Sequence, residues 1–225
     1  MSIKSHRIGF LGLDSYDLIL LIAKYLDKLG QRVLIMDYSK FGRLSYCIPT
    51  PVSLSPEKDL IQYNNLDFVR YNEEIIQRED YNYIIIDFGW DVSHHLIPSC
   101  ERIYIVTDLQ QQNMEQILSI NIPELTVYIL LKNYFHENNI KNVEHYFKEN
   151  HFSIKNCYLF PASERDLENM VMLQYYHDIK LNQTSKQLRN LIYTILINNF
   201  NFGEKEVVKL RKRNKKHLKE RRGND

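Results

Sequence analysis

Two aspartates stand where this chain is best placed to do chemistry. Asp37 closes the strand predicted at 32–37, and Asp87 closes the strand predicted at 81–87, which has the strongest strand pattern in the chain. Parallel sheets bind ligands beyond the carboxyl ends of their strands, so both acids are candidate site residues. A magnesium role for them would need a phosphate to complete the coordination of the ion. The capping of a neighbouring turn or helix is the other role that the sequence leaves open for them.

The turn that would hold that phosphate is Gly12-Leu13-Asp14-Ser15. It lies between an apolar run at 8–11 and an amphipathic helix pattern at 18–29, which a second buried strand follows. A phosphate-binding loop needs glycines, so that backbone N–H groups converge, and a lysine to meet the negative charge. This turn has Gly12 but no lysine, and Asp14 adds a negative charge. We therefore expect a shortened structural turn, with nucleotide binding as the alternative.

The remaining elements alternate between strands and helices. Strands are predicted at 66–69, 102–107, 125–131 and 157–160, and helices at 73–78, 110–120, 136–149 and 184–199. Lys132 and Asn133 are expected to end the strand at 125–131. The alternation predicts an α/β fold, with a mostly parallel sheet and helices on both faces. Residues 1–200 are expected to form one domain and residues 201–225 a basic tail, either flexible or helical.

The composition is typical of a globular protein. Of the 225 residues, 44% are apolar and 25% are charged, which suffices for a full core. The three cysteines are isolated and lack metal-ligand spacing, which favours reduced thiols and a cytoplasmic location. No apolar run reaches the roughly 18 residues of a membrane span. His94 and His95 are adjacent and are expected to point in different directions, so no metal site is predicted.

The C-terminal tail concentrates positive charge. Residues 209–222 contain nine Lys or Arg and one acid, which gives this segment a net charge of +8. The whole chain has a net charge of +1, so the remaining residues carry 1 − 8 = −7. The readings left open are a solvated extension, non-specific contact with nucleic acid, peripheral contact with an anionic membrane surface, and contact with an acidic protein. The residues expected to make the contact are Lys209, Arg211, Lys212, Arg213, Lys215, Lys216, Lys219, Arg221 and Arg222.

Taken in order, these features resemble the MinD/ParA family of P-loop ATPases over roughly residues 6–200. RIGFLG stands where the family's first strand enters its phosphate loop, RVLIMDYS is similar to its second strand, and YNYIIIDFGW resembles its Walker B strand. RIYIVTDLQQQNMEQI looks like the strand and helix that follow, and LTVYILLKNY matches the strand after them. LFPASERDLENM resembles the late turn and helix that border the nucleotide. The resemblance implies a magnesium-associated position at Asp87 and a base-contacting position at Asn133, for which turn formation is the alternative.

The phosphate loop departs from the family pattern. The family's loop carries two lysines in a glycine-rich run, and by resemblance these support ATP binding, hydrolysis and dimerisation; this chain has GLDSYD and is several residues shorter. We therefore expect a degenerate member, a pseudo-ATPase without catalytic residues, cofactor or metal. Its role is similar to that of the TadZ/CpaE-type proteins, which help localise pilus or secretion machinery. The vestigial nucleotide site is expected to comprise Gly12, Asp14, Ser15, Asp37, Asp87 and Asn133.

The function predicted from these features is non-catalytic. We expect a scaffold, positioning or assembly subunit that acts through protein–protein contacts, with a homodimer among its forms, in a bacterial pilus, secretion or conjugation apparatus. The first alternative is an active ATPase that uses ATP and magnesium at an atypical or partner-completed site. The second is a partition-like protein that binds DNA non-specifically through the basic tail.

Overall fold

The structure is a computed structural model that describes residues 5–78, 80–120, 126–134, 140–149, 153–161, 163–179, 181 and 183–222. Within these ranges, side chains are described except at residues 77–78, 133–134, 140–142, 144, 161 and 214–222.

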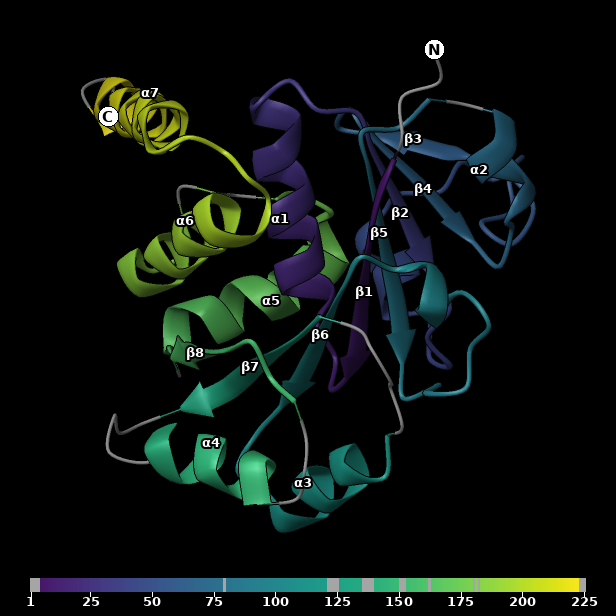
Figure 1. Ribbon diagram of the computed structural model, residues 1–225. Helices are drawn as coiled ribbons and strands as arrows, with labels where there is room; N and C mark the ends of the chain where they lie inside the picture. Colours follow the sequence, from purple (N-terminus) through teal and green to yellow (C-terminus); the bar gives the residue numbers. More distant parts are fainter. Residues whose placement is uncertain are drawn as a thin grey trace.

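A single eight-stranded sheet forms the centre of the molecule (Figure 1). Its order is β3-β4-β2-β5-β1-β6-β7-β8, and every neighbouring pair is parallel except β3 and β4. The predicted mostly parallel α/β sheet is thus confirmed. The strands are β1 (His6–Gly12), β2 (Val33–Asp37), β3 (Ile61–Tyr63), β4 (Leu66–Arg70), β5 (Tyr83–Gly89), β6 (Arg102–Thr107), β7 (Val127–Tyr134) and β8 (Asn156–Pro161).

Helices cover both faces of the sheet, because successive strand residues point to opposite faces and both sets are apolar. In β5, Tyr83 and Ile85 face one core, whereas Ile84 and Ile86 face the other. The first core is covered by α1 (Tyr16–Lys28), α5 (Glu164–Tyr176), α6 (Lys186–Asn199) and α7 (Glu204–Arg222). The second is covered by α2 (Glu74–Arg78), α3 (Gln111–Leu118) and α4 (Ile140–Glu149). Two 3-10 helices, η1 (Arg43–Cys47) and η2 (Ile97–Ser99), lie in connections.

A row of aromatic rings crosses the sheet beneath α6. Phe10, Tyr104, Tyr128 and Tyr158 stack from β1 to β8, with neighbouring ring centres 5.1, 5.2 and 6.1 Å apart. Asn199 of α6 donates to the Tyr104 hydroxyl at 2.6 Å and accepts from the Tyr158 hydroxyl at 2.9 Å. Both phenols are thereby satisfied in a buried layer, which fixes α6 on the sheet.

Several elements differ from the sequence expectation. The 3-10 helices η1 and η2 and the antiparallel edge strand β3 were not predicted, because elements of three to five residues carry no periodic pattern. The prediction that Lys132 and Asn133 end their strand is wrong, since β7 continues to Tyr134. The pairing register of β7 with β8 shifts only after Leu131, and the ladder resumes at Tyr134.

The basic tail is helical and begins against the body of the protein. Val207 and Leu210 of α7 are buried in the same core as α1 and α6. The connection into α7 packs on the first residue of β5, where Tyr83 lies 5.4 Å from Phe200 and 6.2 Å from Phe202 between ring centres. The tail therefore starts at the amino end of the strands. Among the described helices, none combines the length and apolarity that a membrane crossing requires.

Candidate functional site

A cavity of about 210 Å³ lies beyond the carboxyl ends of β1, β6 and β7. This is the position at which open parallel sheets bind ligands. Side chains from the turn after β1, from η1, and from the start of α5 also line it. The lining residues are Leu13, Asp14, Asp17, Arg43, Asp108, Lys132, Phe160, Ser163, Asp166, Leu167 and Met170.

The turn after β1 is closed against β6. Gly12 has φ +102°, and a Cβ atom there would clash with the Val106 carbonyl oxygen. The same oxygen accepts a hydrogen bond of 2.9 Å from the backbone N–H of Leu13. Ser15 is the N-cap of α1 but makes no side-chain capping hydrogen bond. The turn is therefore short, and the Leu13 N–H is already engaged with the protein itself.

A lysine does enter the site, but it comes from β7. Lys132 donates from Nζ to the Asp14 carbonyl oxygen at 2.7 Å and to Asp17 Oδ1 at 3.1 Å. Its ammonium also lies 5.2 Å from the centre of the Phe160 ring. Lys132 is 8% exposed and Asp17 6%, so this ion pair is buried. The positive charge that a phosphate would need is thus used to hold the turn and α1 together.

Sequence reasoning missed Lys132, although a signal was present. Tyr128 and Leu130 face the core that contains α1, and a strand alternates with a period of two residues. The same alternation places Lys132 on the α1 side, one step beyond Leu130. A lysine that continues the buried face of a strand needs an acidic partner. Asp17, in the first turn of α1, is that partner.

Acidic side chains dominate the rest of the cavity. Asp14 forms an ion pair with Arg43 of η1. Asp108 accepts hydrogen bonds from the backbone and side chain of Gln110 and from the side chain of Asn113, and so fixes the start of α3. Four aspartates thus face two cationic side chains in the cavity lining.

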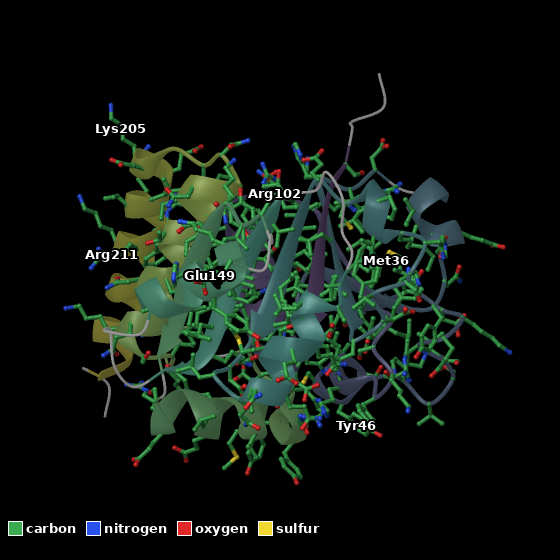
Figure 2. The ribbon with its side chains drawn as sticks, turned by 60° about the horizontal axis from the view of Figure 1, so that its bottom comes forward. Met36, Tyr46, Arg102, Glu149, Lys205 and Arg211 are labelled. Carbon is green, nitrogen blue, oxygen red and sulfur yellow. The ribbon has the colours of Figure 1, made fainter. Side chains whose placement is uncertain are left out.

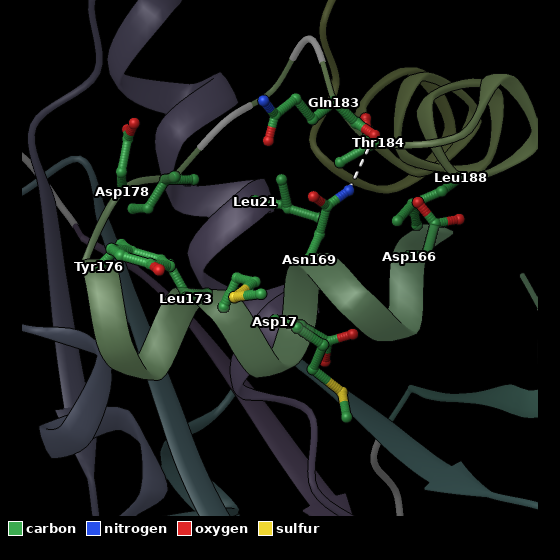
Figure 3. A pocket seen from close by; sticks show the side chains of 13 residues that line it. Asp17, Leu21, Asp166, Asn169, Leu173, Tyr176, Asp178, Gln183, Thr184 and Leu188 are labelled. Carbon is green, nitrogen blue, oxygen red and sulfur yellow. Dashed lines mark hydrogen bonds between the residues drawn. The ribbon is translucent and has the colours of Figure 1, made fainter. Parts of the chain in front are cut away.

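Asp166 connects this cavity to a smaller one. It is 6% exposed; Oδ1 accepts from the Ser185 backbone N–H at 2.7 Å, and Oδ2 has no hydrogen-bond partner in the described part of the chain. The smaller pocket, about 50 Å³, lies between α1 and α5 and is also lined by Asp17 (Figure 3). Asn169 donates to the Gln183 carbonyl at its rim, at 2.8 Å.

Asp37 and Asp87 lie side by side, as register partners on β2 and β5. Asp37 Oδ1 accepts from the backbone N–H and hydroxyl of Ser39, at 2.9 and 2.6 Å. Asp87 Oδ1 accepts from the Gly89 N–H at 3.0 Å. Burial raises the pKa of both carboxyls, and for Asp87 the neighbouring Asp37 adds to it and brings the pKa to about 7. These acids cap the turns that follow them, which is the structural role left open by the sequence.

The raised pKa of Asp87 predicts a pH-dependent stability. An acid whose folded pKa lies above its unfolded value contributes stability that is complete below about pH 4 and is lost as the pH rises through about 7. A rise from 3.8 to about 7 corresponds to at most about 4 kcal/mol. We expect Asp87→Asn to remove this part of the pH dependence, so that urea unfolding at pH 5 and pH 8 shows a smaller difference than in the wild type. Asp91→Asn, in an exposed turn, is the control. Equal pH slopes for wild type and Asp87→Asn would contradict the prediction.

The predicted site residues are only partly brought together. Gly12, Asp14 and Ser15 form the turn at the cavity, and Asp37 lies beside Asp87 on the neighbouring strand. Asp37 ends β2 as predicted, whereas the prediction that Asp87 closes its strand is wrong, since β5 continues to Gly89. Asn133 belongs to β7, but its side chain lies outside the described residues. Of the basic residues assigned to the tail, Lys209, Arg211, Lys212 and Arg213 are exposed on α7; the side chains of Lys215, Lys216, Lys219, Arg221 and Arg222 lie outside the description.

The expectation that His94 and His95 point apart is wrong. Their rings stack, with centres 4.7 Å apart. They lie in an irregular turn after β5, in which Asp91 accepts from the N–H and hydroxyl of Ser93. The alternation of a strand does not apply to such a turn, so adjacent side chains share one side.

The residues of the cavity do not fit a nucleoside triphosphate. Pockets for drug-sized ligands measure about 300–1,000 Å³, and this cavity is smaller. Its four carboxylates repel phosphate, and Lys132 is paired with Asp17. The turn offers one glycine where converging N–H groups would require several.

Comparison with known proteins places the fold. The sequence matches no protein-family model and no curated protein. The structure is similar to a ParA family ATPase from Chlorobium tepidum TLS, with TM-score 0.60 and 17% identity over 87% of this chain and 100% of that one. It is similar to the MinC:MinD cell division protein complex of Aquifex aeolicus, with TM-score 0.61 and 14% identity over 87% and 97%. It also resembles pNOB8 ParA bound to nonspecific DNA, with TM-score 0.52 and 12% identity over 87% and 100%.

These similarities extend over most of both chains at low sequence identity, so they establish the fold. They agree with the order of strands and the sheet topology described above. The protein has the α/β fold of the ParA and MinD ATPases.

Proposed function

We propose that this protein is a non-catalytic relative of the ParA and MinD ATPases that acts as a scaffold or positioning subunit through protein–protein contacts. The observation that carries the proposal is the buried ion pair between Lys132 and Asp17. In this pair, the one lysine among the described cavity residues binds the turn after β1 and is not available to a phosphate. A bacterial pilus, secretion or conjugation apparatus is the setting that we propose, by analogy of role with degenerate relatives.

Exposed apolar side chains beside the cavity support a role in protein contacts. Five residues of α5 are exposed by 42–73%, and α5 packs against η1, in which Tyr46 is 64% exposed. Phe41, two residues before η1, is 68% exposed. Large exposed apolar side chains that gather on one side of a soluble protein are typical of protein–protein interaction sites. The five residues of α5 are Leu167, Val171, Met172, Tyr175 and Tyr176.

Nucleotide binding tests the proposal. We expect calorimetry with ATP or ADP, at millimolar concentration and with magnesium, to give no binding heat, and the melting temperature to stay constant. Micromolar, magnesium-dependent binding that Asp87→Asn abolishes would overturn the non-catalytic reading. Asp91→Asn serves as the matched control, since Asp91 is exposed and lies four residues after Asp87. If such magnesium-dependent binding is observed, the alternative of an atypical ATPase that uses ATP and magnesium stands.

Contact with DNA is the second candidate, favoured by the charge of α7. Lys205 and Arg211 project away from the body of the protein (Figure 2). The similar fold of a ParA bound to nonspecific DNA supports this candidate. Because α7 starts at the amino end of the strands, its role is separable from that of the cavity.

A truncation after Arg213 tests DNA binding without removing the buried Val207 and Leu210. We expect the full chain to bind duplex DNA at low salt in a fluorescence anisotropy assay, with affinity that falls steeply as salt rises. The truncated chain should bind much more weakly while it retains the melting temperature of the full chain. Binding that survives the truncation, or that does not depend on salt, would exclude the tail as the contact.

A further inference from the structure

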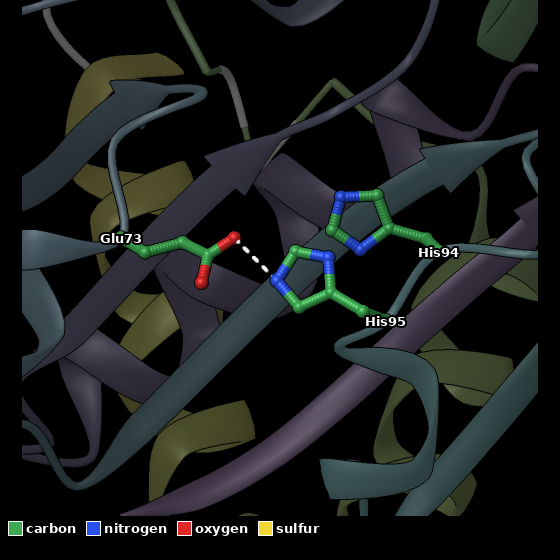
Figure 4. A group of neighbouring side chains, drawn as sticks. All are labelled: Glu73, His94 and His95. Atoms are coloured by element: carbon green, nitrogen blue, oxygen red, sulfur yellow. Dashed lines mark ion pairs between the residues drawn. The ribbon is translucent and has the colours of Figure 1, made fainter.

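Three potential metal ligands meet on the second face of the sheet. Glu73, just before α2, and His94 and His95, after β5, offer ligand atoms that all lie within 4.8 Å of one another (Figure 4). His95 Nε2 lies 2.9 Å from Glu73 Oε1. The residues come from two connections that are 21 positions apart in the sequence. We infer that Glu73, His94 and His95 form a binding site for a divalent transition metal, with zinc as the ion that fits them.

The donor set decides the class of ion. Two imidazole nitrogens and one carboxylate are a ligand set that zinc uses in three-ligand sites, with a fourth position for water or another group. Magnesium and calcium prefer oxygen ligands throughout, so they do not match this set. The site is independent of the cavity at Lys132 and of the function proposed above.

One of the ligands is already held in place. His94 is packed against two aromatic rings, with centres 4.3 Å from Tyr38 and 5.1 Å from Phe88. Its Nδ1 also lies 3.3 Å from the Leu96 backbone nitrogen. A ligand that is fixed before binding loses little conformational entropy when the metal arrives.

The other two ligands have freedom to adjust. The side chains of His95 and Glu73 are 69% and 39% exposed. Zinc bonds of about 2.1 Å place tetrahedral ligand atoms about 3.4 Å apart. The widest separation of 4.8 Å therefore has to contract, and the exposed side chains of His95 and Glu73 can rotate to close it.

A fourth group adjoins the cluster. The Tyr38 ring packs at 4.3 Å from His94 between ring centres, and its hydroxyl is buried. Tyr38 therefore forms one wall of the site and limits the directions from which water can reach His94.

Zinc titration of the full-length protein, after removal of metals with a chelator, tests the inference. We expect calorimetry to show one equivalent of zinc bound in the micromolar range, and cobalt to produce a visible ligand-field band that zinc displaces. His95→Ala and Glu73→Gln should each weaken binding by at least about tenfold. Zinc should raise the melting temperature of the wild type and not that of His95→Ala. His95 is exposed, so its replacement is compatible with folding.

Two control variants separate this site from adventitious binding. His145 forms an ion pair with Glu149 on α4 at 3.0 Å, so it is a histidine–carboxylate pair without a second histidine in the described residues around it. Cys157 is a partly exposed thiol. We expect His145→Ala and Cys157→Ser to bind zinc as the wild type does. No saturable zinc binding in the micromolar range, or a loss of binding in either control, would overturn the inference.

Discussion

Lys132→Met is expected to destabilise the protein by about 3–5 kcal/mol, because it leaves Asp17 as an uncompensated buried charge. It also removes the donor to the Asp14 carbonyl. Urea unfolding at pH 7 measures the change in the free energy of unfolding. Arg43→Met is the control. It breaks the ion pair between Arg43 and Asp14, which are both half-exposed, and should lower the free energy of unfolding by less than about 1 kcal/mol.

The double variant Lys132→Met/Asp17→Leu separates the pair from its surroundings. Replacement of both members of a buried ion pair by apolar side chains is often neutral, so the double variant should recover much of the loss. A cost below about 1 kcal/mol for Lys132→Met alone would contradict the buried pair. Lys132 would then be free to meet a ligand, and the proposal that the site is non-catalytic would lose its main support.

Gly12→Ala is expected to cost about 3 kcal/mol or more. An L side chain at φ +102° is strained by about 1–3 kcal/mol, and the added Cβ would clash with the Val106 carbonyl oxygen. That oxygen belongs to the backbone of β6, so relief requires strand movement, which costs about 1–3 kcal/mol. Urea unfolding measures the loss.

Gly30→Ala is the matched control for this prediction. Gly30 also has a positive φ, +79°, but no atom lies within 4 Å of the position of an added Cβ. Its replacement should cost about 1 kcal/mol, from backbone strain alone. Equal losses of unfolding free energy at the two positions would contradict the close contact between Gly12 and Val106. The turn would then be more open than described, and the cavity beside it would be larger.

The fold was predictable because its signals are local. The buried strands that contain Asp37 and Asp87 are apolar runs of ordinary length, and the helix at 18–29 has a clear period, which α1 (Tyr16–Lys28) largely matches. Alternation of such elements admits few topologies. The departure of the turn at Gly12 from a phosphate loop was equally visible.

The site was less predictable because it is assembled from distant segments. Lys132 meets the turn across 118 residues, and the length of β7 decides whether its side chain reaches Asp14. The stack of His94 and His95 depends on the turn that Asp91 caps, and no spacing rule describes such a turn. Contacts of this kind depend on the three-dimensional arrangement of the elements, so no short sequence motif predicts them.

The edge strand β3 bears on how copies of this protein can meet. β3 has three residues and runs antiparallel to β4, so it offers only a short row of unpaired backbone groups to another chain. Short edge strands discourage the addition of a foreign strand, which is the first step of sheet-to-sheet aggregation. At this edge, the addition of a strand from a second copy is therefore disfavoured. A contact here has to be made by side chains, which mutation can change one residue at a time.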